Sequence, residues 1–387
     1  MRILWINTVG VLGGAERSLV DLLPPLAARG HELAVACPYG ALAAAAAEAG
    51  ADIFSIPAVR LRRPSLRHPG WLTGWLTLPA ARHRLAGIIR ARQPGVVHAN
   101  SLAAMLALPA LHGRPALWHV RDLRLPSAAV RLAARRAGAI VAISPAVEAR
   151  LRALLPPSQH AKIKLIPNGI PLPDAASLPD RAEARRRLGL PPTAPLAGML
   201  AHLIPWKRHD RLIAATATLA ARQPALHVVL AGGDLCGEHA GYVRRLHAQI
   251  AAAGLERRIL LLGAVDQPLT FLRALDLLVH PADDEPFGRV VCEAMAAGTP
   301  VLAMNRGGPA TILEHDKTGW LVDPDAPGAL AEAVERLLTD HALRGRLAAR
   351  AAVRVREAYD INTTATRLAK LYQGIGQDNT VFPCTRA

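Results

Sequence analysis

One stretch of the sequence indicates the fold and the chemistry together: Asp283-Asp-Glu-Pro-Phe-Gly-Arg-Val-Val-Cys-Glu-Ala-Met-Ala-Ala-Gly-Thr-Pro-Val-Leu-Ala303. It follows an apolar run, 277–279, that is typical of a buried strand, and residues 288–297 are expected to form a helix. Loops that leave the carboxyl ends of strands are where open α/β sheets bind ligands. Glu285 in the loop and Glu293 in the helix are therefore candidate site residues.

The same alternation of short apolar runs and longer amphipathic segments continues on both sides of this stretch. In the first half we predict strands at 3–6, 32–36, 52–55, 96–99, 116–119, 139–143 and 163–166, with helices at 15–29, 72–92 and 127–137. In the second half we predict strands at 196–200, 227–230, 259–262, 277–279 and 299–303, with helices at 208–222, 241–253, 288–297 and 327–339. Such alternation favours parallel sheets covered on both faces.

A turn-rich connector, Pro167-Asn-Gly-Ile-Pro-Leu-Pro173, interrupts the alternation and marks a domain boundary. The predicted fold class is α/β, with two Rossmann-like domains whose parallel sheets face a central cleft, and 387 residues suffice for two cores. The expected organisation is a first domain over 1–170, a linker over 171–192, a second domain over 193–355, a C-terminal helix over 356–373 that returns to the first domain, and a flexible tail over 374–387.

Composition excludes a mainly disordered chain, because 51% of the residues are apolar and only 20% are charged. The first residues lack the pattern of a signal peptide, and no apolar run is long enough to span a bilayer. The four cysteines (Cys37, Cys236, Cys292, Cys384) form no CxxC pair, which predicts free thiols. We expect a cytoplasmic protein.

The formal net charge of +16 favours partners that carry phosphate: a nucleotide, an anionic lipid or a nucleic acid. Basic residues cluster between Arg60 and Arg92 and are interleaved with tryptophans: Arg60, Arg62, Arg63, Arg67, His68, Trp71, Trp75, Arg82, His83, Arg84, Arg90 and Arg92. This pattern suits an anionic membrane surface, but also a solvated helix whose tryptophans face the core. Nucleic acid is not an expected partner, because no nucleic-acid-binding motif is found.

Single residues carry less information by themselves. Gly13 and Gly14 follow the first predicted strand, so they form either a tight turn or a loop whose backbone approaches a diphosphate. A carboxylate at Glu293 among apolar residues needs a partner, either a sugar diol or an arginine. An isolated lysine such as Lys207 is usually a solvated charge, and an isolated histidine such as His119 is usually structural.

Glu285-Pro-Phe-Gly together with Glu293-Ala-Met-Ala-Ala-Gly-Thr-Pro-Val closely resembles the E-x7-E region of retaining glycosyltransferases of the GT-B fold, in the large family 4. Further segments resemble the same family in the same order along the chain: Gly13-Gly14-Ala-Glu16, Arg29-Gly-His-Glu32, Ile166-Pro-Asn-Gly169 and Thr318-Gly-Trp-Leu-Val322. The resemblance covers nearly the whole chain. It implies that the first domain binds the acceptor and the second binds a nucleotide sugar.

The resemblance also implies a role for each matching residue. Glu293 would bind the nucleotide ribose, and Glu285 would lie beside the donor sugar at the reacting centre. Phe287 and Gly288 would offer backbone N–H groups to the sugar, and Lys207 would neutralise the diphosphate.

In the first domain His119 would line the cleft near the donor sugar, and Gly13 and Gly14 would approach the diphosphate. The implied catalytic residues are Glu285, Lys207 and His119. No metal or other cofactor is expected, because Lys207 and backbone N–H groups could stabilise the leaving diphosphate without one.

The chain departs from the family pattern near the diphosphate lysine. His202 occupies the position where the family usually has an arginine, and Arg208 is the residue that could compensate. Ala282 follows Pro281 where serine is common, and Thr311 stands where glutamate is frequent.

We therefore expect a retaining, metal-independent glycosyltransferase that transfers a sugar from a UDP- or GDP-type donor to a carbohydrate or lipid-linked acceptor. Envelope polysaccharide or glycolipid synthesis is the expected context, with docking at the inner face of the plasma membrane as a further expectation. The alternatives are a nucleotide-sugar epimerase, a catalytically impaired GT-B relative, and a basic nucleic-acid-binding protein.

Overall fold

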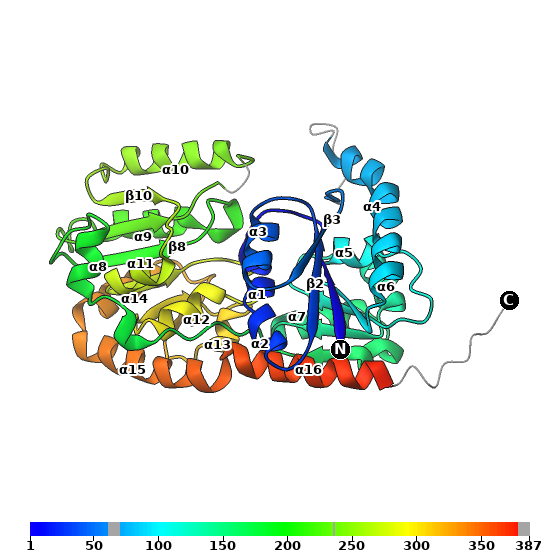
Figure 1. Ribbon diagram of the computed structural model, residues 1–387. Helices are drawn as coiled ribbons and strands as arrows, with labels where there is room; N and C mark the ends of the chain where they lie inside the picture. The colour runs from blue at the N-terminus through cyan, green and yellow to red at the C-terminus, as the bar shows by residue number, and fades with distance from the viewer. Residues whose placement is uncertain (61–69, 235–236, 378–387) are drawn as a thin grey trace. The chain divides into compact units, whose positions relative to one another are not determined.

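The computed structural model describes residues 1–60, 70–234 and 237–377 (Figure 1). The chain divides into two compact units. Unit 1 comprises Met1–Pro171 and the chain from Ile361 onward, and unit 2 comprises Leu172–Asp360.

Unit 1 is built on a seven-stranded parallel sheet with the order β3-β2-β1-β4-β5-β6-β7. Its strands are β1 (Arg2–Ile6), β2 (Glu32–Cys37), β3 (Asp52–Ser55), β4 (Val96–Ala99), β5 (Ala116–Val120), β6 (Ala139–Ala142) and β7 (Ile163–Leu165). The winding direction reverses between β1 and β4, and a crevice for ligands forms outside the carboxyl ends of the strands at such a point. Every strand of unit 1 overlaps a predicted one, because an apolar run flanked by helices is a strong local signal.

The helices of unit 1 are α1 (Gly14–Val20), α2 (Leu23–Ala27), α3 (Ala41–Glu48), α4 (Gly70–Arg92), α5 (Leu102–Ala107), α6 (Ser127–Arg136), α7 (Pro145–Leu154) and α16 (Ile361–Gln377), with a short 3-10 helix at Pro157–Lys162. The single helix predicted over 15–29 is two helices. Pro24 and Pro25 lie in the first turn of α2. Since proline lacks the N–H that a continuous helix would require, the chain begins a new helix there.

Helix α16 completes the hydrophobic core of unit 1. Its buried side chains Leu368 and Tyr372 belong to the same apolar cluster as Ile3 and Trp5 of β1. The predicted boundary at residue 356 falls inside α15 of unit 2, which ends at Ala358. The predicted tail also begins too early, because 374–377 are still helical; its remaining residues lie outside the described part of the chain.

Unit 2 repeats the architecture with a six-stranded parallel sheet, in the order β10-β9-β8-β11-β12-β13. The strands are β8 (Leu196–Leu200), β9 (His227–Ala231), β10 (Ile259–Gly263), β11 (Leu277–His280), β12 (Val301–Met304) and β13 (Trp320–Val322). Here the winding reverses between β8 and β11. Strand β13 was not predicted, because its three apolar residues directly after a turn are too short a run to indicate a strand. Both units are Rossmann-like, so the predicted α/β class with two parallel sheets is confirmed.

The helices of unit 2 are α8 (Arg181–Arg187), α9 (His209–Leu219), α10 (Ala240–Ala252), α11 (Pro268–Ala274), α12 (Arg289–Ala296), α13 (Pro309–Ile312), α14 (Ala329–Thr339) and α15 (His341–Ala358), with short 3-10 helices at Ala175–Ser177 and Pro205–Lys207. The segment predicted as a linker, 171–192, contains α8. That helix is anchored in unit 2 because the buried Arg185 donates to Asp276 over 2.8 Å.

Several predictions concern residues whose structure is not described. Arg62, Arg63, Arg67 and His68 lie in the undescribed segment 61–69, and the side chains of Trp71 and Trp75 are also outside the described set. Cys37 and Cys292 are free and buried, as predicted, whereas Cys236 and Cys384 lie outside the described residues. Across the described residues, every helix is too short or too polar to cross a membrane.

Candidate active site

Two charged residues of unit 2 come together where the sheet reverses its winding. Lys207 ends the short 3-10 helix that follows β8, and Glu285 lies in the loop that follows β11. Because β8 and β11 are neighbours in the sheet, their carboxyl ends bring both residues to one place. The nitrogen Nζ of Lys207 lies 2.5 Å from Oε2 of Glu285.

This ion pair is largely enclosed, with side-chain exposures of 14% for Lys207 and 10% for Glu285. Nζ of Lys207 also lies over the ring of Trp206, 4.3 Å from its centre. Burial by itself would raise the pKa of Glu285, but the charge of Lys207 and the neighbouring His280 outweigh it and hold that pKa well below its usual value. Glu285 is therefore a carboxylate at neutral pH.

A third residue, His280, contacts the same carboxylate oxygen. It ends β11 and is 1% exposed, and its Nε2 lies 3.3 Å from Oε2 of Glu285. Burial lowers the pKa of His280 most, Glu285 raises it and Lys207 lowers it. Sequence reasoning missed His280, because a lone histidine at the end of an apolar strand usually belongs to the core; its position directly before the Glu285 loop was the available signal.

Two glycines that were not singled out from the sequence support the Glu285 loop. The N–H of Gly308 donates to the carbonyl of Glu285 over 2.8 Å. A Cβ at Gly308 would lie 2.1 Å from the carbonyl oxygen of Phe287, and one at Gly307, where φ is +66°, would lie 2.5 Å from that of Glu285. Only glycine fits at these two positions without moving the loop.

The remaining residues of the E-x7-E region lie at the start of α12. Gly288 precedes this helix with φ of +99°, a conformation that favours glycine. The ring of Phe287 is buried against Tyr359, with 5.8 Å between ring centres. Oε1 of Glu293 accepts a hydrogen bond from Nε of Arg289 over 2.6 Å. The arginine partner considered for Glu293 is thus present within one turn of helix, and a ribose diol would share this carboxylate with Arg289.

His202 and Arg208 were predicted to bind phosphate beside Lys207, and the structure places them in different surroundings. His202 is half-buried, and burial and then the charge of Lys207 lower its pKa, so it is neutral at pH 7. Arg208 adopts the left-handed conformation at φ 61° and is bound by two carboxylates, 2.9 Å from Asp283 and 3.1 Å from Asp210. The suggestion that Arg208 compensates for His202 therefore requires it to leave both acids.

In unit 1 a polar network lies at the equivalent reversal point, between the ends of β1, β4 and β5. Arg121 donates from Nε to Asn100 over 2.8 Å and from Nη1 to Asn168 over 2.9 Å. Asn100 in turn donates to Asn7 over 3.1 Å. All four side chains are buried. The guanidinium group of Arg121 thereby links the loop after β4 to the turn that contains Asn168, and Asn100 extends the link to the loop after β1.

His119 lies inside this network and not on a surface. Its side chain is 0% exposed, and its Nδ1 is 3.0 Å from Nε2 of His98 on β4. Burial, followed by the charge of Arg121 and by His98, lowers the pKa of His119 well below its usual value. We predicted that His119 lines a cleft beside the donor sugar. In the structure residue 119 belongs to β5, and its side chain faces the core. A structural role fits its position better.

The glycine loop also differs from expectation. The N–H of Gly13, in the loop predicted to approach a diphosphate, donates to the carboxylate of Glu16 over 3.2 Å. This contact places an acidic group at the start of α1, where it opposes an anion. Gly14, in contrast, has open space where a side chain would stand.

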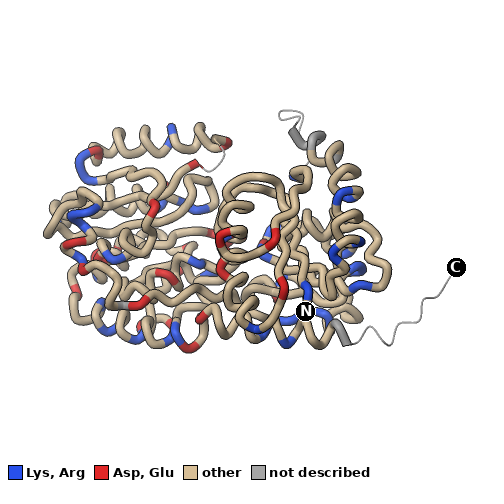
Figure 2. Tube along the Cα trace, viewed as in Figure 1, with Lys and Arg blue, Asp and Glu red and all other residues tan. Residues whose placement is uncertain are grey.

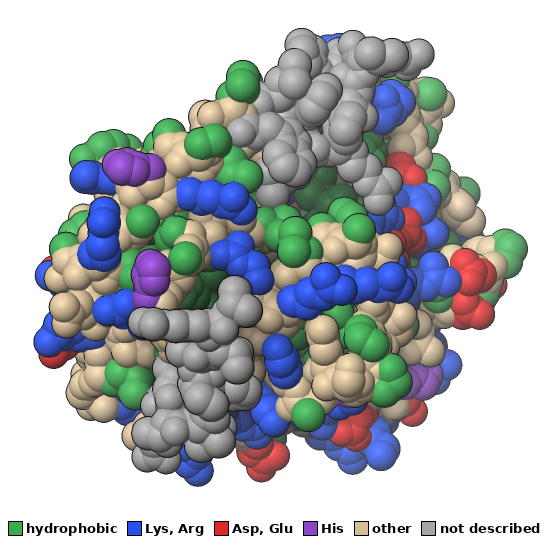
Figure 3. Space-filling view, turned by 90° about the vertical axis from the view of Figure 1, so that its right-hand side faces the viewer, with side chains coloured by type: hydrophobic (Ala, Val, Ile, Leu, Met, Phe, Trp, Pro, Cys, Tyr) green, Lys and Arg blue, Asp and Glu red, His purple; other side chains and the backbone are tan. Residues whose placement is uncertain are grey.

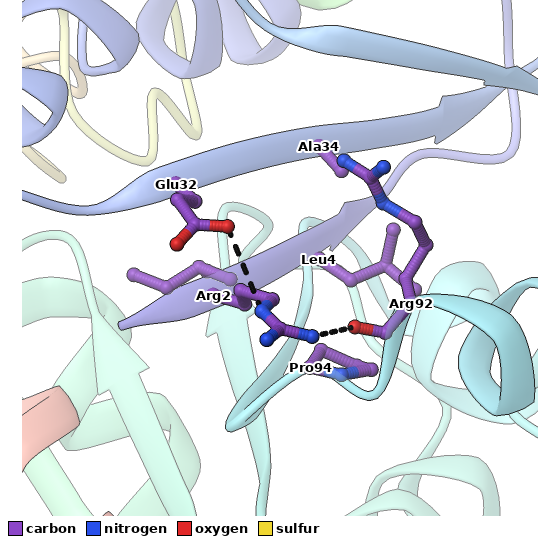
Figure 4. A pocket seen from close by; sticks show the side chains of 7 residues that line it. Arg2, Leu4, Glu32, Ala34, Arg92 and Pro94 are labelled. Atoms are coloured by element: carbon purple, nitrogen blue, oxygen red, sulfur yellow. Dashed lines mark hydrogen bonds and ion pairs between the residues drawn. The ribbon is translucent and has the colours of Figure 1, made fainter.

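One small pocket is found at the opposite edge of the unit 1 sheet (Figure 4). It lies at the amino ends of β1 and β2, where Arg2 pairs with Glu32 at 3.6 Å and donates to the carbonyl of Arg92 over 3.2 Å. Its volume of about 10 Å³ holds roughly one water molecule. This pocket is therefore too small for a substrate.

The basic segment of unit 1 is partly used for structure. In Figure 2 α4 carries arginines and no acidic residues. Arg82 donates to the carbonyl of Leu106 over 2.8 Å, Arg84 reaches that of Ser55 at 3.4 Å, and Arg92 pairs with Asp52. The face seen in Figure 3 nevertheless shows many Lys and Arg side chains next to apolar ones. Some basic side chains therefore bind backbone carbonyls or Asp52 within unit 1, whereas others face solvent.

Known protein families and known proteins resemble both units of the chain. The family model for glycosyl transferases group 1 matches residues 180–354, and that for glycosyltransferase family 4 matches residues 12–173. D-inositol 3-phosphate glycosyltransferase from Kineococcus radiotolerans is 33% identical over 232 residues, which is 56% of this chain and 53% of that protein. The enzyme of the same name from Salinispora arenicola is 39% identical over 176 residues, 43% of this chain and 39% of that protein.

Solved structures with the same fold cover nearly the whole chain. HepE of Anabaena in complex with UDP-glucose has a TM-score of 0.82 at 26% identity, over 97% of this chain and 100% of that one. Sucrose-phosphate synthase from Thermosynechococcus elongatus has a TM-score of 0.81 at 21% identity, over 97% and 99%. The fold is that of a GT-B glycosyltransferase.

Within that class, the chain belongs to glycosyltransferase family 4. The two family models together account for most of its length, one for each unit. It spans about half the length of the curated relatives that it matches.

Proposed function

We propose that the protein is a retaining, metal-independent glycosyltransferase that uses a nucleoside-diphosphate sugar as donor. The observation that carries the proposal is the Lys207–Glu285 pair at the reversal point of the unit 2 sheet, inside the segment that resembles the E-x7-E region. The structural relative HepE, determined with UDP-glucose, supports a UDP-type donor.

The chemistry requires Lys207 to change partners. In the reaction an acceptor oxygen forms a bond to the anomeric carbon, the bond from that carbon to the diphosphate breaks, and the acceptor proton passes to the leaving phosphate. Negative charge grows on the diphosphate, and a fixed cation such as Lys207 stabilises it more in the transition state than in the ground state. Glu285 would then face the sugar, and Glu293 would bind the ribose beside Arg289.

Fewer contacts in the structure support the proposed donor-site residues of unit 1. Gly14, with open space beside it, remains our candidate for close approach to the donor, whereas the bonded Gly13 and the buried His119 are weaker candidates. The acceptor is proposed to be a carbohydrate or lipid-linked sugar, in polysaccharide or glycolipid synthesis.

Peripheral docking on an anionic membrane through the Arg60–Arg92 region is a separate proposal. The exposed Leu76 on α4 and the basic side chains on the face in Figure 3 support it. Flotation with anionic and neutral vesicles tests it: equal recovery from both vesicle types would contradict docking.

Calorimetric titration with UDP, GDP and ADP tests the donor site. We expect one nucleotide to bind the wild type and to bind Glu293→Ala at least tenfold more weakly, since a hydrogen bond to a charged group contributes roughly 1.5–3 kcal/mol. Glu332→Ala, which removes an exposed carboxylate from α14 of the same unit, is the matched control and should bind normally. Absence of binding to all three nucleotides would contradict the proposal.

A further inference from the structure

The carboxylate of Glu285 in unit 2 lies beside two basic side chains, those of Lys207 and His280. Oε2 of Glu285 is contacted by Nζ of Lys207 at 2.5 Å and by Nε2 of His280 at 3.3 Å. All three groups are enclosed, with His280 the most deeply buried at 1% exposure. Glu285 therefore has one charged partner, Lys207, and one neighbour, His280, that can become charged by binding a proton.

Donor binding would disturb this arrangement. If Lys207 turns toward a diphosphate, the buried Glu285 carboxylate loses its cation. Leaving a buried charge without a partner is strongly unfavourable, so the carboxylate would move, take up a proton or acquire another cation. His280 is already within reach of the same oxygen, and its ring becomes a cation by binding one proton.

We propose that His280 is the positioning residue for Glu285: it lies beside the carboxylate and, when Lys207 turns to the diphosphate of the donor, it takes up a proton and holds the carboxylate in place. This inference rests on the proposed function, because it requires a nucleoside-diphosphate sugar at Lys207. His280 acts through Glu285 and does not itself contact the substrate.

The charged and titratable groups facing His280 determine the direction of the effect. They are Glu285 from the following loop, Lys207 from the segment after β8, and His209 at the start of α9. Lys207 lowers the pKa of His280 and Glu285 raises it. A diphosphate that neutralises Lys207 removes the lowering influence, so the pKa of His280 rises on binding. His209 stays neutral, because burial lowers its pKa to about 4.

A ligand that raises the pKa of a group binds more tightly at lower pH. Affinity for the donor should therefore increase as the pH falls through the region where His280 titrates in the complex, by up to about tenfold for each unit by which its pKa rises. The same linkage makes binding consume protons.

Titration calorimetry in two buffers with different ionisation enthalpies measures this proton uptake directly. The probe is UDP-glucose, whose diphosphate is esterified at both ends and has no group that titrates near neutrality, so the protons counted belong to the protein. We expect net uptake with the wild type and none with His280→Asn, whose amide cannot become a cation. His247→Asn, which removes an exposed histidine of α10, should retain the wild-type uptake.

Three results separate the possible outcomes. Proton uptake that persists in His280→Asn, or wild-type binding without uptake, would overturn the inference while leaving the proposed function intact. If His280→Asn does not fold, His280→Gln gives the same comparison with a longer amide. Failure of the wild type to bind any nucleoside-diphosphate sugar would overturn the proposed function itself, and this inference with it.

Discussion

The hydroxyl of Tyr372 lies 2.6 Å from Nδ1 of His98, a residue 274 positions earlier in the chain. Both side chains are fully buried in unit 1, and the ring of His98 stacks on Trp5 with 3.4 Å between ring centres. Through His119 and Arg121 the same polar chain continues to Asn100 and the ends of the strands. The last helix of the chain is therefore attached to the polar centre of the first unit.

Replacement of Tyr372 by phenylalanine keeps the ring but leaves a buried nitrogen of His98 without its partner. We expect a loss of about 1–3 kcal/mol in the free energy of unfolding of unit 1. Hydrogen exchange of the β4 and α16 amides measures this loss within the unit concerned. Tyr39→Phe alters a side chain that is 82% exposed and should change stability by less than about 0.5 kcal/mol. Equal effects of the two changes would contradict the importance of this hydrogen bond.

Arg121→Lys tests whether the guanidinium fork organises the ends of the unit 1 strands. A lysine ammonium cannot reproduce the two divergent hydrogen bonds to Asn100 and Asn168, so we expect destabilisation by about 1–3 kcal/mol. Urea unfolding measures the change, with the exposed Arg135→Lys of α6 as its control. If Arg121→Lys is as stable as the wild type, a positive charge at residue 121 is enough for stability and the two divergent hydrogen bonds are not required.

The Lys207–Glu285 pair makes a pH-dependent contribution to stability. The pKa of Glu285 is lower in the folded protein than in the unfolded chain, so its contribution is complete above the unfolded value of about 4.3 and decreases as the pH falls toward the lowered folded value. Glu285→Gln should destabilise unit 2 by roughly 3–5 kcal/mol at neutral pH, and the difference should narrow in acid.

Thermal unfolding of the wild type and Glu285→Gln at a series of pH values measures this difference. Glu332→Gln, at an exposed site of α14, should give nearly the wild-type curve throughout. A difference between Glu285→Gln and the wild type that grows as the pH falls would have the wrong sign for the proposed ion pair.

The loop that positions Glu285 depends on the close approach of Gly308. Alanine there would place its Cβ 2.1 Å from the carbonyl oxygen of Phe287, so the loop must shift, with an expected loss of about 1–3 kcal/mol and weaker nucleotide binding. Gly345→Ala in α15 is the opposite case: no atom lies within 4 Å of the added methyl, and stability should rise by roughly 0.5–1 kcal/mol. Denaturant unfolding and nucleotide calorimetry of both variants test the pair.

His202→Arg would add a permanent cation next to Lys207, at the position where His202 is held neutral. If this residue faces the diphosphate, nucleotide affinity should increase by about tenfold or more, since a charge-assisted contact contributes roughly 1.5–3 kcal/mol. His247→Arg adds the same charge on the exposed face of α10 and should have little effect at physiological salt. Unchanged affinity in calorimetry would place residue 202 away from the phosphates.

The sequence and the structure agree most closely where a signal is local. The strands over 96–99 and 196–200 have the predicted limits, because a buried strand in a parallel sheet is a short apolar run. Agreement is poorest where a residue's neighbours come from elsewhere. His119 was predicted to line a cleft near the donor sugar, and only its pairing with β4 and β6 shows that its side chain lies against His98 in the interior of unit 1.

The sequence by itself determined the α/β class, the two parallel sheets, and the segments that contain Lys207 and Glu285, because hydrophobic periodicity and turn chemistry act over a few residues. Tertiary structure alone decided that these two residues meet across 78 positions, that His280 shares their carboxylate, and that Arg208 is bound by acids. It also decided that α16 completes the core of unit 1. Such contacts depend on which strands lie side by side, and strand order is set by the packing of the whole sheet.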